Sequence, residues 1–223
     1  MTKTARPTAV RHSGFDINSS FVIRHSSFRG GTAFAFTIIE LLVVIAIIII
    51  LAGLILSTVG YVQKKGARSR AEAEIAAMSA ALENYKADNG IYPTDATTNL
   101  LKANSDGDPT QSVYTNASLY LYKELSGDHD ANRTVNASDD LSGNGVVPKT
   151  YVMFKSNQLS PTDQLLAVQF LRDPFGNSYG YSTVKSSNPA GTDGYNPTFD
   201  LWSTGGVVSN TNPPDQTQWI KNW

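Results

Sequence analysis

A run of 21 mostly apolar residues, Phe36 to Leu56, constrains the fold of this chain more than any other feature. At about 1.5 Å per residue, a helix of this length spans about 30 Å, which is the thickness of the hydrocarbon core of a bilayer. The run carries one acid, Glu40, near its start. A carboxylate inside a membrane costs about 2.5–3.5 kcal/mol on insertion scales, so Glu40 is a candidate functional residue.

The charge of the chain differs on the two sides of this run. Residues 1–35 form a basic leader with five basic residues and one acid, too polar to lie in the membrane. The rest of the chain keeps 13 of the 18 basic residues and 18 of the 19 acids, so it is mildly acidic. Binding to nucleic acid needs a clustered basic face, so we expect no nucleic-acid partner. The chain has no cysteine, which excludes disulfides and thiol chemistry.

The apolar run does not have the form of an ordinary secretory signal peptide. It is longer than a typical hydrophobic region of such a peptide, and no small-x-small cleavage site follows it. A cut before the run, which would leave it in the mature protein, fits better. Charge alone barely favours a cytoplasmic leader, because four basic residues also follow the run: Lys64, Lys65, Arg68 and Arg70.

Beyond the run, the pattern predicts that the helix continues to Asp88. Ile75, Met78, Leu82 and Tyr85 are spaced by three, four and three residues, which places them on one helix face that we expect to pack against a following domain. Asn89-Gly90 then predicts the end of the helix.

The remainder, residues 91–223, is rich in turn-forming residues and holds short apolar segments. The pattern predicts one short helix over 117–125. It also predicts strands over 151–155, 169–171, 178–184 and 198–203, with a turn at Asp173-Pro-Phe-Gly-Asn. A helix followed by antiparallel strands is an α+β order.

Glu40 also has a structural interpretation. Thr37 and Glu40 match a helix capping box, in which each side chain accepts a hydrogen bond from the other residue's backbone N–H. The helix dipole stabilises an acid in the first turn by about 0.3–1 kcal/mol, less than the cost of burying it. Capping would be served equally by an acid outside the apolar run, so it does not by itself account for Glu40.

The segment Phe-Thr-Ile-Ile-Glu followed by Leu-Leu-Val-Val-Ile resembles the processing and methylation site of the type IV pilin family, whose superfamily includes the pseudopilins of type II secretion. The resemblance implies cleavage by a prepilin peptidase between Ala35 and Phe36, and N-methylation of Phe36. It also implies that Glu40 pairs with the Phe36 amine, commonly of a neighbouring subunit, during assembly. Such pairing lowers the cost of a buried charge. The family has Gly before the cut, whereas this chain has Ala35.

Three C-terminal segments are similar to the major pseudopilins of type II secretion: Leu171 to Tyr181, Phe199 to Ser203 and Trp219 to Trp223. The resemblance implies an α+β, pilin-like fold, in which a long N-terminal helix packs on a small antiparallel β-sheet head. The implied segments are a cleaved leader (1–35), a transmembrane and filament-core helix (36–60), its amphipathic continuation (61–90) and a periplasmic head (91–223).

The resemblance also implies partners and a location. The subunit would stand in the bacterial inner membrane as a single-pass protein and then form a homo-oligomeric helical filament, the periplasmic pseudopilus. Its other partners would be the prepilin peptidase, the secretion platform and minor pseudopilins. Two alternatives stay open: a type IV pilin or minor pilin for adhesion or DNA uptake, and a monomeric membrane-anchored binding protein.

Two loops are candidate calcium sites. The family carries calcium in its last loop, which here offers Asp215 as its one acid, with Ser203, Asn210 and Asn212 as further oxygen donors. The second candidate is a loop in which Asp128, Asp130, Asn132 and Asp139 occupy positions 1, 3, 5 and 12 of an EF-hand-like pattern. Position 6, normally Gly, is Arg133, and such Asp/Asn-rich runs are more often solvated loops.

The sequence favours a structural protein over an enzyme. Two of its three histidines, His12 and His25, lie in the leader, and His129 lies in the polar loop, so they form no triad or zinc site. The sequence also contains no nucleophile-elbow, Walker or dinucleotide-binding motif. We therefore expect no catalytic residues and, apart from calcium, no cofactor.

Overall fold

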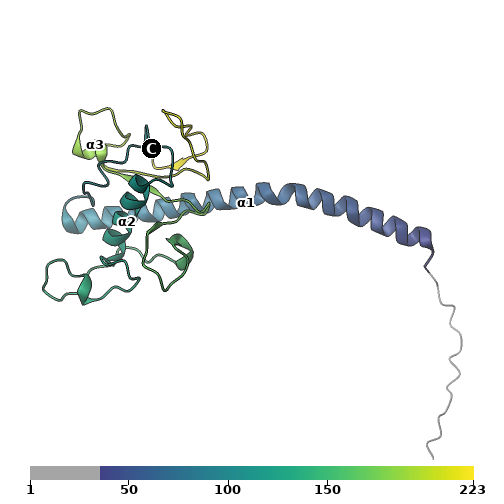
Figure 1. Cartoon of the computed structure of the whole chain (residues 1–223), viewed down its shortest axis with the longest axis horizontal. Helices are drawn as coiled ribbons and strands as arrows, with labels where there is room; N and C mark the ends of the chain where they lie inside the picture. Colours follow the sequence, from purple (N-terminus) through teal and green to yellow (C-terminus); the bar gives the residue numbers. More distant parts are fainter. Residues whose placement is uncertain (1–35) are drawn as a thin grey trace, which may run out of the picture. The chain divides into compact units, whose positions relative to one another are not determined.

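The computed structural model describes residues 36–223, and the long helix α1 within it runs from Ile38 to Asn89 (Figure 1). The chain divides into two compact units, Met1–Ile50 and Leu51–Trp223, which we describe separately. The helix predicted to end at Asp88 is confirmed to within one residue. Gly90 ends it with a φ of +80°, and the Gly90 N–H donates to the Lys86 carbonyl at 2.7 Å. Glycine adopts this left-handed conformation without a steric penalty.

The second unit carries the head, an α+β layout consistent with a pilin-like fold (Figure 1). Helix α2, Ser112–Ser126, packs on two small antiparallel sheets, one ordered β1-β2 and the other β3-β4-β5. The remaining elements are η1 (Ala137–Asp139), η2 (Ser156–Gln158), β1 (Leu159–Ser160), β2 (Phe170–Leu171), β3 (Gly180–Ser182), α3 (Val184–Ser187), β4 (Asp200–Ser203) and β5 (Ile220–Lys221).

The main core of the head forms where the predicted apolar face of α1 is buried. Ile75, Met78 and Leu82 of α1 lie in one cluster with Leu121 of α2 and Leu201 of β4. Burying one such side chain contributes about 1.5–3 kcal/mol. The spacing of these α1 residues in the sequence is therefore explained by core packing, as predicted.

A second cluster forms around Trp202 of β4, which is fully buried. Its ring stacks on Trp219 with centroids 5.8 Å apart, and its indole N–H donates to the Tyr114 hydroxyl at 3.2 Å. Gly180 of β3 lies directly beneath this ring, because a Cβ added there would be 2.3 Å from the indole. The indole therefore requires glycine at this position of the strand.

One strand prediction is wrong, and another is only partly confirmed. Residues 151–155 form no strand, because the backbone N–H groups of Tyr151 and Val152 both donate to one carbonyl, that of Leu125, instead of to a partner strand. Their aromatic and β-branched character serves packing instead, since the Tyr151 ring lies 5.2 Å from that of Tyr85. The strand predicted over 178–184 is shorter than expected, because the short helix α3 begins at Val184.

The predicted turn at Asp173-Pro-Phe-Gly-Asn is confirmed, and it holds a buried carboxylate. The Gly176 N–H donates to the Asp173 carbonyl at 3.0 Å. The Asp173 carboxylate accepts the N–H groups of Phe175 and Asn177 at 3.0 and 2.8 Å, and the Ser203 hydroxyl donates to its second oxygen. Burial outweighs these donors and raises the pKa of Asp173. The hydrogen bond from Ser203 therefore links this turn to the last residue of β4.

Candidate functional site

The start of α1 carries the candidate site that the sequence singles out. The Thr37 N–H and hydroxyl donate to Glu40 Oε2 at 2.9 and 2.8 Å, and the Glu40 N–H donates to Thr37 Oγ1 at 3.2 Å. This is the reciprocal bonding of a capping box, so the structural interpretation of Glu40 is confirmed. Both donors from Thr37 reach the same carboxylate oxygen, Oε2.

Phe36 lies beside this capping box. Its side chain is 80 % exposed, and it directly precedes Thr37, whose N–H contacts the Glu40 carboxylate. Cleavage before Phe36 would therefore create an amine one residue before Thr37, whose N–H already donates to the Glu40 carboxylate. Ala35, the residue before the predicted cut, lies outside the described residues.

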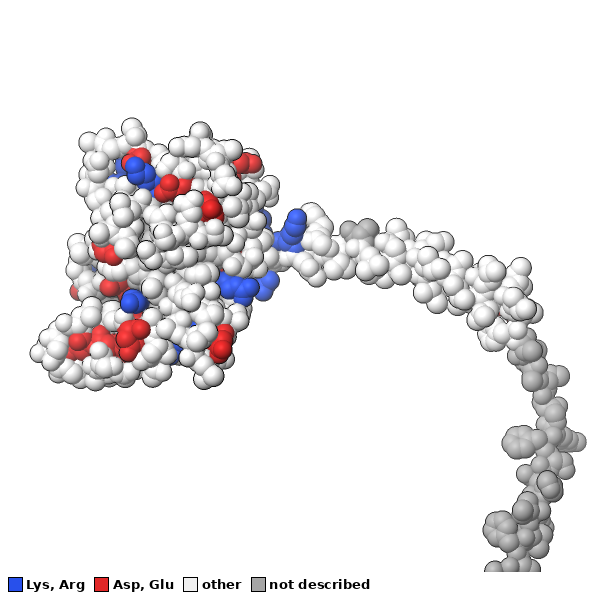
Figure 2. Space-filling view, in the orientation of Figure 1, with Lys and Arg blue, Asp and Glu red and all other residues white. Residues whose placement is uncertain are grey.

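The apolar surface of α1 is the second part of this site. Its most apolar 18-residue window has a mean hydropathy of 3.3, and none of it is buried within the protein, so the helix is long and apolar enough to cross a membrane. Figure 2 draws this part of α1 almost wholly in white, without clustered charge. An apolar surface of this extent is rare on a soluble monomer and is typical of a membrane or protein interaction site.

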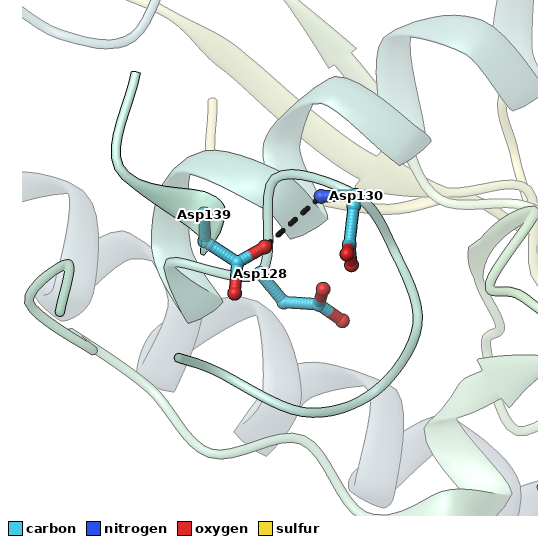
Figure 3. A group of neighbouring side chains, drawn as sticks. All are labelled: Asp128, Asp130 and Asp139. Carbon is cyan, nitrogen blue, oxygen red and sulfur yellow. Dashed lines mark hydrogen bonds between the residues drawn. The ribbon is translucent and has the colours of Figure 1, made fainter. Parts of the chain in front are cut away.

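The acidic loop after α2 brings together three of the four side chains predicted for calcium. Carboxylate oxygens of Asp128, Asp130 and Asp139 lie within 4.8 Å of one another (Figure 3). Asp128 and Asp139 are buried and Asp130 is exposed. The Asp130 N–H donates to Asp139 Oδ1 at 3.1 Å, drawn as the dashed line in Figure 3. The left-handed φ of +76° at Arg133 occupies the position where the EF-hand pattern has glycine.

This loop is organised by its own hydrogen bonds. Asp128 accepts the N–H groups of Asn132 and Arg133 at 3.1 and 2.7 Å, together with the Tyr122 hydroxyl at 2.5 Å. Burial raises the pKa of Asp128. Burial also disfavours ionised Asp139, but the N–H groups of Asn136 and Asp130 outweigh it, so the pKa of Asp139 is lowered.

The oxygen donors of the acidic loop and their spacing are compatible with calcium. Asn132 is the fourth predicted ligand, and its side-chain oxygen accepts the Thr134 N–H at 2.8 Å. Because these oxygens already serve the loop's own backbone, the loop has a structural role without a metal. Calcium binding here stays a prediction.

The residues predicted for calcium in the last loop have other partners. Ser203 is buried and its hydroxyl donates to Asp173. Asp215 is exposed and accepts the Thr217 N–H at 3.0 Å, which is the first cause of its lowered pKa. Asn210 and Asn212 are exposed as well. Calcium binding in this loop also stays a prediction.

In the sequence, Lys64 and Lys65 bear only on membrane orientation. The structure places both in a groove with Phe175, from the turn after β2, and with Gly205. The signal in the sequence was the position of these lysines, eight and nine residues beyond the apolar run. Their contact with the distant loop around Gly205 could not be read from the sequence.

The fold is an α+β head on a long helix that is apolar enough to cross a membrane. Compared with curated proteins, the chain is 39 % identical over 72 residues to type II secretion system core protein G of Klebsiella michiganensis. The matched region is 32 % of this chain and 47 % of that protein, so the chain spans about half the length of its relative. This similarity supports a pseudopilin-like relationship. No family model and no solved structure matches the chain.

Proposed function

We propose that this chain is a structural subunit of a type II secretion pseudopilus. In this proposal a prepilin peptidase cuts between Ala35 and Phe36, and the Phe36 amine is methylated. The apolar part of α1 then anchors the subunit in the inner membrane, with the head in the periplasm. Subunits leave the membrane as they join a homo-oligomeric helical filament, with the secretion platform and minor pseudopilins as partners.

The observation that carries this proposal is an unburied, membrane-length helix that opens on Glu40 and a capping box. The apolar side chains of this helix can be surrounded either by lipid or by neighbouring copies of the same helix. Because both surroundings are apolar, the subunit can move from one to the other at a small cost in free energy. The similarity to a type II secretion core protein supports the secretion assignment.

Glu40 has the chemistry to set the register of the assembly. Its carboxylate accepts two hydrogen bonds from Thr37 in the single chain, both on Oε2. An amine on a neighbouring copy would pair with it in a low-dielectric environment, where leaving either charge alone costs about 3–5 kcal/mol. Only one axial offset between neighbouring helices brings the two groups together, so this pairing selects that offset.

The test replaces Glu40 in cells that express the complete secretion system. We expect Glu40→Ala and Glu40→Gln to abolish filaments, measured by electron microscopy and cross-linking, while the membrane-bound amount of subunit is unchanged. The matched control is Glu83→Gln, an exposed acid on the same helix, which should leave filaments intact. Wild-type filament levels in Glu40→Gln would contradict the proposed pairing.

A second experiment distinguishes the pseudopilus from a surface pilus. A pseudopilus stays in the periplasm, so shearing cells should recover no filaments of this subunit. Recovery of filaments by shearing would favour a type IV pilin. A monomeric anchored binding protein would instead keep its activity in Glu40→Ala.

A further inference from the structure

Four basic side chains follow the apolar run within the second unit, and we call them the basic collar: Lys64, Lys65, Arg68 and Arg70. Figure 2 shows blue side chains gathered where α1 meets the head. Among the described residues, Arg68 forms an ion pair with Glu72 at 3.4 Å, whereas the other three collar residues are exposed and have no ion pair. The collar therefore presents three uncompensated positive charges.

The collar lines a groove rather than a flat surface. A groove of about 750 Å³ is bounded by Lys64, Lys65 and Arg68 on the helix and by Phe175 and Gly205 on the head. A second hollow of about 420 Å³ is lined by Lys64, Arg70 and Phe175. Phe175 thus lines both hollows together with basic side chains of the collar.

The wall of the groove is fixed by Arg68. Its guanidinium donates to the carbonyls of Gln218 and Trp219 at 3.0 and 3.3 Å. Gly205 has a φ of +65°, and a Cβ there would be 2.2 Å from the Gln218 carbonyl, so only glycine lets the loop close. Because Arg68 is committed to this wall, the two lysines are the collar's free groups in the groove.

A bilayer around the apolar run would place the collar near the membrane surface. Lys64 follows Leu56 by eight residues, or about 12 Å of helix, and a lysine side chain can extend back toward the headgroups. Tyr61 lies between them with 70 % of its surface exposed. Tyrosine is enriched at this depth, where an apolar ring with a polar tip fits the interface.

We propose that the basic collar binds the phosphodiester headgroup of an anionic phospholipid. The phosphate would lie in the groove beside Lys64 and Lys65, with the apolar part of the lipid beside Tyr61 and the apolar run. Continuity with the apolar run favours lipid over an acidic protein surface. This proposal rests on the membrane anchoring in the proposed function and does not depend on filament assembly. Bound lipid would hold the head against the membrane until the subunit is extracted.

The experiment measures amine acetylation of the full chain in lipid nanodiscs, residue by residue, by mass spectrometry. We expect acetylation of Lys64 and Lys65 to be about five-fold slower in phosphatidylglycerol discs than in phosphatidylcholine discs, because one basic group near an anionic surface gains about that factor. High salt should remove the difference. Lys86, about 32 Å further along α1, is the internal reference and should react equally in both discs.

A charge-matched pair of variants completes the test. The double variant Lys64→Gln, Lys65→Gln should retain less phosphatidylglycerol than wild type on native mass spectrometry, while Lys86→Gln, Lys123→Gln should retain as much. Equal acetylation rates in both lipids would overturn the proposal. Slow acetylation of Lys64 and Lys65 that is equal in both lipids and becomes fast on dilution in detergent would also overturn the proposal. In that case a second copy of the chain, rather than lipid, would cover the collar. Release of the chain from the discs by alkaline carbonate would instead contradict the membrane anchor itself.

Discussion

Single residues in the head show how buried charge is accommodated in a small core. Asp173 and Asp200 are both buried, and burial raises the pKa of each carboxyl group. Asp200 accepts the N–H groups of Tyr195 and Asn196, both at 2.8 Å, so each carboxylate fixes the backbone of a neighbouring loop. These carboxylates therefore accept backbone N–H groups in two loops of the head.

Replacing Asp173 tests this role. We expect Asp173→Asn to lower the free energy of unfolding by about 1–3 kcal/mol, because an amide cannot accept all three donated hydrogen bonds. The raised pKa means that folded Asp173 binds its proton more tightly than unfolded Asp173, whose pKa is about 3.8. Wild-type stability relative to the variant should therefore rise as the pH falls from the folded pKa toward that value. Urea unfolding followed by tryptophan fluorescence measures this, and a pH-independent difference would contradict it.

Two glycines allow the same substitution to be compared in opposite environments. Gly180→Ala should destabilise the head by about 1–3 kcal/mol, since the added Cβ overlaps the Trp202 indole. Gly66→Ala should stabilise α1 by up to about 1 kcal/mol, because no atom lies within 4 Å and alanine is the better helix former. Thermal unfolding of both variants provides the measurement. Equal effects of the two substitutions would contradict the packing described for Trp202.

At the scale of elements, the sequence pattern correctly predicted the buried face of α1. It failed at residues 151–155, where apolar side chains pack against the core but the backbone pairs with no strand. The face of α1 with Ile75 and Leu82 was predictable because its spacing depends only on helix geometry. Residues 151–155 have strand composition, but their donors converge on the Leu125 carbonyl. That contact joins segments far apart in the chain, so local propensity could not predict it.

The attachment of the C-terminal segment to α1 is testable at this scale. Arg68→Ala removes the donors to the Gln218 and Trp219 carbonyls. We expect amide hydrogen exchange in residues 218–223 to become about five-fold faster, equivalent to about 1 kcal/mol of lost hydrogen bonding. Arg70→Ala is the matched control, because Arg70 is exposed and makes no hydrogen bond or ion pair to the described residues. Faster exchange in both variants would indicate a general charge effect instead.

For the whole molecule, the predicted α+β order and the membrane-length helix are both present in the described residues. The sequence also brought Asp128, Asp130 and Asp139 to attention before the structure placed them together. The groove between the basic collar and Gly205 was not predictable, because it depends on how the last loop closes on Gln218. The proposed function depends on one event, which is the release of an amine at Phe36, next to Glu40.

The intact mass of the protein from cells that contain a prepilin peptidase tests this central claim most directly. We predict a mass that begins at Phe36 and includes one additional methyl group. The same chain from cells without the peptidase should retain residues 1–35. A mature protein that keeps these residues in the presence of the peptidase would contradict the account.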